Sequence, residues 1–178
     1  LSAYHNEVTG SKLILHVEFP DGRHNMIQIE DGYFQELAYK RLNYVNDHDP
    51  SKIDAILITH NHIDHTGLLP KSVRDGFNGH IYMTEITAEL CPLYLYNSCQ
   101  HQQENVEEMK KEYPAEEKIF RPLYRKSDVE NTIKKIIGVS YGKTIEILPG
   151  IEVTFFVNAH ILGAAMILVQ CKYGEFQP

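Results

Sequence analysis

THNHIDHTG, at residues 59–67, is the stretch that decides the fold of this chain. It places three imidazoles and one carboxylate within six consecutive residues, namely His60, His62, Asp64 and His65. The stretch directly follows the apolar run IDAILI at residues 53–58, which is typical of a buried strand. Because open α/β sheets bind ligands beyond the carboxyl ends of their strands, the sequence predicts a functional site here.

The donor types in this stretch favour a metal site. Residues i and i+2 of an extended chain point to the same side, so His60 and His62 can converge on one ion. Asp64 and His65 follow a turn and can face a second ion beside the first. Imidazole nitrogens and carboxylate oxygens suit a borderline-soft divalent ion such as zinc. The alternative is a histidine-rich surface turn without a metal, which four donors after a buried strand disfavour.

Three residues outside the cluster are candidates for the same site. His160 follows a second predicted strand, and we expect it to be the third ligand of the ion held by His60 and His62. Glu30 and Asp31 follow another predicted strand and could accept the second N–H group of a ligating imidazole, which fixes its orientation. The alternatives are a structural histidine at the edge of the core and ordinary acidic residues in a turn.

The composition is typical of a soluble globular protein, with 43% apolar and 23% charged residues among 178. This length suffices for one domain or for part of a larger one. The net charge of −7 argues against a large, sequence-independent nucleic-acid surface on this segment. We find no apolar window of transmembrane length and no signal peptide. Three cysteines without CxxC spacing favour free thiols and a cytoplasmic location.

Hydrophobic periodicity predicts strands at both ends of the chain and helices in the middle. We expect strands over 11–19, 26–29, 53–59, 81–84, 144–148, 152–157 and 166–171, and helices over about 68–76, 85–112 and 128–137. Pro92 is expected to kink the long helix or to mark its true start. Ser127 or Asp128 is the expected N-cap of the last helix. The sequence thus predicts an α/β fold with helices flanking a sheet.

Other chemical motifs do not stand out. The GxSxG elbow of serine hydrolases and the glycine-rich phosphate loops GxGxxG and GxxxxGKS are absent from the sequence. Residues 118–135 carry six lysines and arginines against two acidic residues. This segment could meet phosphates, but a solvated helix and loop is the simpler interpretation.

Several motifs of the chain resemble those of a known family. THNHIDHTG is similar to the HxHxDH signature of the metallo-β-lactamase fold. Other motifs resemble the β-CASP branch of that fold, the nucleases that process RNA or DNA, such as RNase J and the cleavage-and-polyadenylation endonuclease. They are VTGS at 8–11, GLLP at 67–70, GHIYMT at 79–84, PLY at 122–124 with DV at 128–129, and NAHILGAA at 158–165.

The resemblance implies an incomplete αββα sandwich, with residues 1–178 as the N-terminal portion of the metallo-β-lactamase domain and with the β-CASP domain outside this chain. It implies that His60, His62 and His160 bind one zinc ion, and that Asp64 and His65 bind a second. Asp64 is also the candidate catalytic residue. The implied activity is a phosphodiesterase that cleaves RNA by means of a metal-activated hydroxide.

The chain departs from the family pattern in two places. Glu30 stands where the family has the aspartate of Asp-x-Gly, with Asp31 next to it. The aspartate that bridges both metals in the family would lie beyond residue 171 and is not found here. We therefore expect one well-held ion at most and no activity from this segment alone. Two alternatives stay open: a hydrolase of small esters, thioesters or lactams, and a non-catalytic metal-binding fragment.

Overall fold

The computed structural model describes residues 2–5, 9–36, 38–115 and 120–172, so Val8 of the VTGS motif lies outside the described residues. The strands are β1 (Ser2–His5), β2 (Lys12–Glu18), β3 (His24–Ile29), β4 (Ala55–Leu57), β5 (His80–Thr84), β6 (Ile136–Val139), β7 (Thr144–Leu148), β8 (Ile151–Val157) and β9 (Ala165–Cys171). The helices are α1 (Ile63–Thr66), α2 (Leu69–Arg74), α3 (Glu85–Glu112) and α4 (Lys126–Ile133), with two 3₁₀ helices at Lys40–Tyr44 and Pro50–Lys52.

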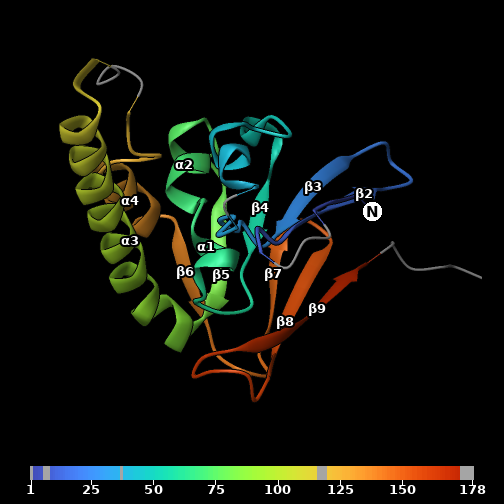
Figure 1. The fold of residues 1–178 in the computed structure, drawn as a ribbon. Helices are drawn as coiled ribbons and strands as arrows, with labels where there is room; N and C mark the ends of the chain where they lie inside the picture. Colours follow the sequence, from blue (N-terminus) through green and yellow to red (C-terminus); the bar gives the residue numbers. More distant parts are fainter. Residues whose placement is uncertain (1, 6–8, 37, 116–119, 173–178) are drawn as a thin grey trace, which may run out of the picture.

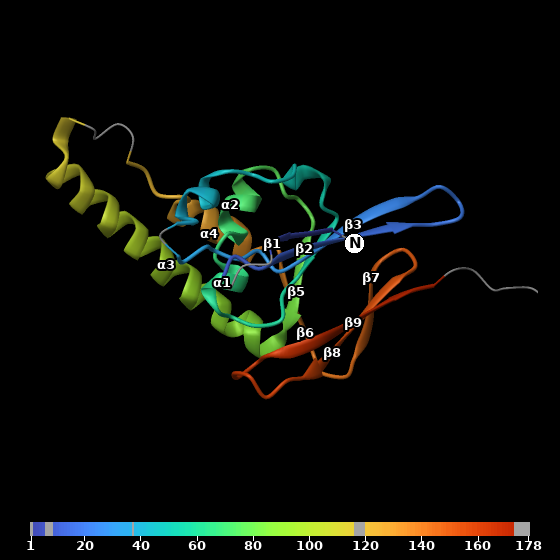
Figure 2. The same cartoon turned by 45° about the vertical axis from the view of Figure 1, so that its right-hand side comes forward.

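The strands form two sheets. The larger sheet has the order β1-β2-β3-β4-β5-β6, with antiparallel pairing from β1 to β3 and parallel pairing from β3 to β6. The smaller sheet, β7-β8-β9, is antiparallel. The helices lie on one side of the larger sheet and the smaller sheet lies on the other, as both views show (Figures 1 and 2). The described residues therefore form one helical layer and two sheet layers.

Strand β4 is buried on both faces. Ile56 packs in the core between the larger sheet and the helices, together with Leu95 of α3. Its neighbour Leu57 points the other way and packs in the core between the two sheets, together with Phe155 of β8. A strand covered on both faces needs apolar residues at every position, which explains why IDAILI shows no alternation.

The predicted strands are confirmed, one of the two expectations for Pro92 is excluded, and the predicted bounds of the last helix are wrong. Pro92 does not mark the start of the long helix, because α3 runs from Glu85 and the Thr84 hydroxyl caps it by accepting the N–H of Thr87 at 3.2 Å. The last helix was expected over 128–137, but α4 ends at Ile133 and the β-branched residues that follow pair with β5 as strand β6.

The expected N-cap of α4 is also corrected. The cap position is Arg125, not Ser127 or Asp128. Asp128 instead occupies the third helical position, where its carboxylate accepts the backbone N–H of Arg125 at 2.8 Å. No helix among the described residues is long and apolar enough to cross a membrane.

Candidate metal centre

The histidine cluster occupies the loop between β4 and α1. The strand ends at Leu57, the chain bends at Thr59, and His62 is extended where it precedes the first turn of α1. The carbonyl oxygen of His62 accepts the N–H groups of His65 and Thr66 at 3.0 and 3.1 Å, so the chain turns sharply there. This turn places the first two histidines before the bend and the Asp64-His65 pair after it.

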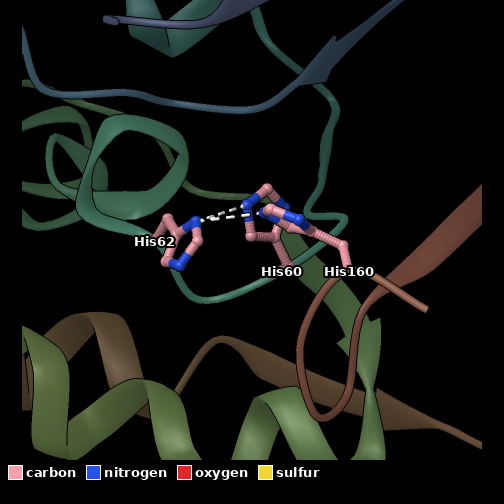
Figure 3. A group of neighbouring side chains, drawn as sticks. All are labelled: His60, His62 and His160. Carbon is pink, nitrogen blue, oxygen red and sulfur yellow. Dashed lines mark hydrogen bonds between the residues drawn. The ribbon is translucent and has the colours of Figure 1, made fainter. Parts of the chain in front are cut away.

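Three imidazoles converge at this loop (Figure 3). The Nε2 atom of His60 is 3.1 Å from Nδ1 of His62, and Nε2 of His160 is 3.3 Å from the same Nδ1. Nitrogens placed tetrahedrally at ~2.0–2.1 Å around zinc are about 3.3–3.4 Å apart, so the spacing fits three ligands of one ion. The structure thus brings together three residues that the sequence places up to a hundred positions apart.

Thr59 fixes the orientation of the His60 ring. Its hydroxyl donates to Oε1 of Glu30 at 2.5 Å and lies 2.8 Å from Nδ1 of His60. Because the hydroxyl has a single proton and gives it to the carboxylate, it accepts the Nδ1–H of His60. The lone pair of His60 is therefore on Nε2, which faces the other two imidazoles.

His60 is electrically neutral in this environment. Burial, and to a smaller extent the nearby His65, His62 and His160, together lower its pKa to about 3. A neutral imidazole is the form that binds a metal. The ligand nitrogen therefore carries no competing proton at ordinary pH.

The imidazole of His65 lies between two carboxylates. Its Nδ1 atom is 3.5 Å from Oε2 of Glu30, and its Nε2 atom is 3.5 Å from Oδ2 of Asp64. The distance between Nδ1 of His65 and Oε2 of Glu30 is at the long end of hydrogen bonding. Among the described residues, neither of these two atoms has a closer hydrogen-bond partner. Burial acts to lower the pKa of His65, but the attraction of the nearby Glu30 and Asp64 carboxylates outweighs it, so the pKa is raised.

Glu30 connects the two halves of the cluster. One carboxylate oxygen reaches His60 through Thr59, and the other faces His65 directly. Glu30, His60 and His65 also form a second group with ligand atoms within 4.8 Å of one another, whereas Asp64 lies beside this group. Glu30 has a φ of 63°, the one positive value of a non-glycine residue in the described chain, and this conformation costs roughly 1–2 kcal/mol. The position of the Glu30 carboxylate is thus accompanied by backbone strain.

Asp31 serves this region mainly through its backbone. Its N–H donates to the carbonyl of His65 at 2.8 Å, and its own carbonyl accepts the N–H of Leu68 at 2.9 Å. The side chain is fully buried and pairs with Nζ of Lys12 at 3.2 Å. A direct role of the Asp31 carboxylate toward an imidazole stays a prediction.

The first turn of α3 anchors both histidine loops. The amide of Asn61, which lies between the first two histidines, donates to the carbonyl of Thr87 at 3.1 Å. The carbonyl of Gly163, three residues after His160, accepts the hydroxyls of Thr84 at 2.7 Å and Thr87 at 2.9 Å. A Cβ atom on Gly163 would lie 2.7 Å from the Thr87 hydroxyl, so only glycine fits this contact. One helix end therefore sets the position of the two loops relative to each other.

Sequence reasoning did not identify several residues that hold this centre. Thr59, Asn61 and Thr87 support the histidine loops, but single threonines and asparagines carry no distinctive signal. In the sequence, Gly32 is only a glycine after a predicted strand. In the structure, a Cβ atom there would lie 1.8 Å from the carbonyl oxygen of Asp64. Close backbone contacts of this kind come from distant parts of the chain, so local pattern does not reveal them.

Comparison with known proteins identifies the family. The model of the metallo-beta-lactamase superfamily matches residues 32–139. The chain belongs to this superfamily. The Zn²⁺-bound PqqB from Methylobacterium extorquens has a similar structure, with a TM-score of 0.51 at 14% identity over 93% of this chain and 50% of that one. At this identity the likeness shows the fold alone, and it confirms the predicted metallo-β-lactamase fold.

Curated relatives place the chain within the superfamily. It is 37% identical to the transcription termination factor FttA of Pyrococcus abyssi over 65% of its length, and 33% identical to the cleavage and polyadenylation specificity factor subunit 3-I of Arabidopsis thaliana over 72%. It is 29% identical to a ribonuclease of Thermus thermophilus over 92%. The matched regions span 16%, 17% and 33% of these relatives, respectively. The relatives confirm the resemblance to the β-CASP branch.

Proposed function

We propose that this chain carries the principal metal site of a zinc-dependent phosphodiesterase that cleaves RNA. The observation that carries the proposal is the convergence of three imidazole nitrogens at 3.1 and 3.3 Å in a superfamily member with RNA-processing relatives. His60, His62 and His160 would hold the ion. When bound, such an ion supplies a Lewis acid for the attack of water on a phosphodiester.

The surrounding residues orient these ligands. Thr59 and Glu30 keep the lone pair of His60 directed at the site, as the hydrogen bonds described above require. Asp64 Oδ2 lies 3.5 Å from Nε2 of His65, on the opposite side of that ring from Glu30, and we propose that it accepts a proton or hydrogen bond from an incoming water. We assign Asp64 the catalytic role on this geometry.

We propose that this segment holds one ion firmly. The three imidazoles form a complete set of protein ligands for a catalytic zinc, which typically has three. Asp64 and His65 offer only two donors to a second ion, and His65 is also the residue whose pKa is raised by its carboxylate neighbours. We therefore expect the His60, His62 and His160 site to fill first.

The cellular setting follows from the cysteines. Cys91, Cys99 and Cys171 are free thiols in the structure. Free thiols are stable in a reducing compartment, which supports a cytoplasmic location for the protein.

Zinc analysis and an RNA cleavage assay test the proposal. We expect about one zinc per chain after dialysis, and we expect His62→Ala to lose both the zinc and the RNA hydrolysis of the whole protein that contains this segment. His80→Ala removes an exposed histidine away from the cluster and serves as the control. If His62→Ala cleaves RNA as fast as the parent protein, the assignment is wrong.

A further inference from the structure

A groove follows one side of α3 and starts beside the metal loop. Its first hollow, with a volume of about 290 Å³, is lined by Ile63, which lies between His62 and Asp64 in the sequence, and by Tyr33 and Tyr94. The other lining residues are amides, a serine and a histidine: Gln35, Asn97, Ser98, His101, Gln102 and Asn105. This end of the groove is aromatic and carries no lysine, arginine or carboxylate.

The groove continues into a second and a third hollow. The second, of about 610 Å³, shares Tyr33, Gln102 and Asn105 with the first. The third, of about 410 Å³, shares Tyr44, Arg121 and Leu123 with the second. Because each hollow shares wall residues with the next, we treat the three as one surface and call it the α3 groove. Helix α3 itself begins near α1 and runs away from it (Figure 2).

Positive charge gathers at the far end of the α3 groove. The third hollow is lined by Lys71, Arg74, Arg121 and Arg125 against a single acidic residue, Asp128. The carboxylate of Asp128 already accepts the backbone N–H of Arg125 as part of the α4 cap. The end of the groove is therefore cationic in a chain whose net charge is −7.

Two of these cations are free to meet a ligand. Lys71 and Arg74 both pair with Asp75, at 2.9 and 2.8 Å. Within the described part of the chain, neither Arg121 nor Arg125 forms an ion pair with a carboxylate. Guanidinium groups bind phosphate in a bidentate manner and are well suited to an RNA backbone.

The middle of the groove is mixed in charge. The second hollow is lined by Lys40, Arg41 and Arg121 and also by Glu108 and Glu112 of α3. Two aromatic side chains that line the groove are substantially exposed, Tyr94 at 45% and Tyr44 at 54%. Tyr44 lines the hollows that carry the cations, whereas Tyr94 lines the first hollow, which carries none. A groove with exposed rings and cations along its length suits a single strand, because bases stack on the rings while phosphates meet the cations.

We propose that the α3 groove binds the single-stranded RNA that extends from the metal centre. The inference rests on the proposed function and adds the path of the substrate. Bases stack against Tyr33 and Tyr94 next to the metal loop, and phosphates reach Arg121 and Arg125 at the far end. The sequence favoured a solvated helix for the basic segment 118–135, of which residues 120–135 are described. The structure adds that Arg121 and Arg125 line the far end of the α3 groove, whose near end is lined by Ile63 of the metal loop.

A binding assay with metal-free protein tests the groove separately from catalysis. The test variant is the double substitution Arg121→Gln/Arg125→Gln. The control, Lys134→Gln/Lys143→Gln, removes two exposed lysines that do not line the groove and changes the net charge equally. With a fluorescein-labelled oligouridine and EDTA, we expect the test variant to bind about tenfold more weakly. The slope of log K against log salt should fall by about 1.4, since each single-strand phosphate contact contributes about 0.7.

Two further measurements locate the strand. RNA containing 4-thiouridine should cross-link to the peptides that contain Tyr33 and Tyr94. In the zinc-loaded whole protein that contains this segment, hydrolysis of bis(p-nitrophenyl) phosphate, which is too small to reach the arginines, should be equal in the test variant, the control and the parent protein.

Several results would overturn the inference. They are equal RNA binding by the test variant and its control, cross-links confined to other surfaces, and tighter binding of an acidic peptide such as polyglutamate. Because binding is measured without metal, it is independent of the proposed function. Absence of RNA cleavage together with groove-dependent RNA binding would refute the proposed function and support the groove.

Discussion

Replacing Glu30 by glutamine should weaken zinc binding without changing a single metal ligand. The carboxylate accepts hydrogen bonds from the hydroxyl and the backbone N–H of Thr59, at 2.5 and 3.2 Å, and it faces Nδ1 of His65 at 3.5 Å. A glutamine keeps the shape but has one amide NH₂, which must point at one of these donors. The Glu30→Gln variant therefore loses the orientation of His60, of His65 or of both.

The expected magnitude follows from the number of ligands affected. Loss of a carboxylate behind a ligating histidine lowers metal affinity 10–100-fold, or about 1.4–2.7 kcal/mol. Thr59→Val separates the two effects, because it removes the hydroxyl that links Glu30 to His60 and keeps the carboxylate that faces His65. We expect Thr59→Val to weaken the site formed by His60, His62 and His160 by about tenfold, and Glu30→Gln to weaken it at least as much.

Competition with a fluorescent zinc chelator measures these affinities directly. Glu152→Gln is the matched control, because it removes a carboxylate that pairs with Lys172 on the smaller sheet. Thermal unfolding of the metal-free proteins should accompany the titration, so that a loss of fold is recognised. Zinc affinities of Glu30→Gln and Glu152→Gln within twofold of each other would refute the relay through Thr59.

Three further predictions concern the frame around the site. Lys12→Met should destabilise the protein by about 3–5 kcal/mol in urea unfolding, because it leaves the fully buried carboxylate of Asp31 without its partner; the double variant with Asp31→Asn should recover much of this loss, and failure to do so would contradict the pairing. Gly32→Ala should lower the free energy of unfolding by about 3 kcal/mol or more and should reduce zinc content, because its Cβ atom would lie 1.8 Å from the carbonyl oxygen of Asp64. A free energy of unfolding equal to that of the parent protein would contradict this prediction. Cys91 should resist iodoacetamide at pH 8 in the folded protein, because burial raises its pKa to about 12, and it should react after unfolding, as mass spectrometry of the labelled peptide can show; labelling of the native protein would contradict this burial.

The sequence was sufficient for most of the strands and for the metal loop. IDAILI followed by four donors in six residues is a local signal, and both the strand and the turn after it lie where the pattern indicated. His160 is a different case. Its position after a strand made it a candidate, but only the packing of β8 and β9 on the larger sheet brings its Nε2 atom to 3.3 Å from His62.

The misassigned segment after α4 has a physical cause. Residues 134–139 contain lysines followed by a short apolar run, and such a run is compatible with the end of a helix or with a buried strand. The available partner decides, because β5 offers an open edge on which Ile136–Val139 can pair. The α3 groove could not be predicted from the sequence either, because the residues that line it come from four separate parts of the chain.

The anchoring of both histidine loops to the first turn of α3 bears on how the protein would behave when zinc is scarce. Thr84 and Thr87 donate hydrogen bonds to Gly163, and Asn61 donates one to Thr87, so both loops are held without a contribution from an ion. Small zinc domains that fold only around their metal unfold when it is withdrawn. Here the depleted protein should persist in its native shape, escape proteolysis and recover on resupply by simple capture of the ion. If the proposed zinc-dependent activity holds, it would thus stop when zinc is withdrawn and return without new synthesis.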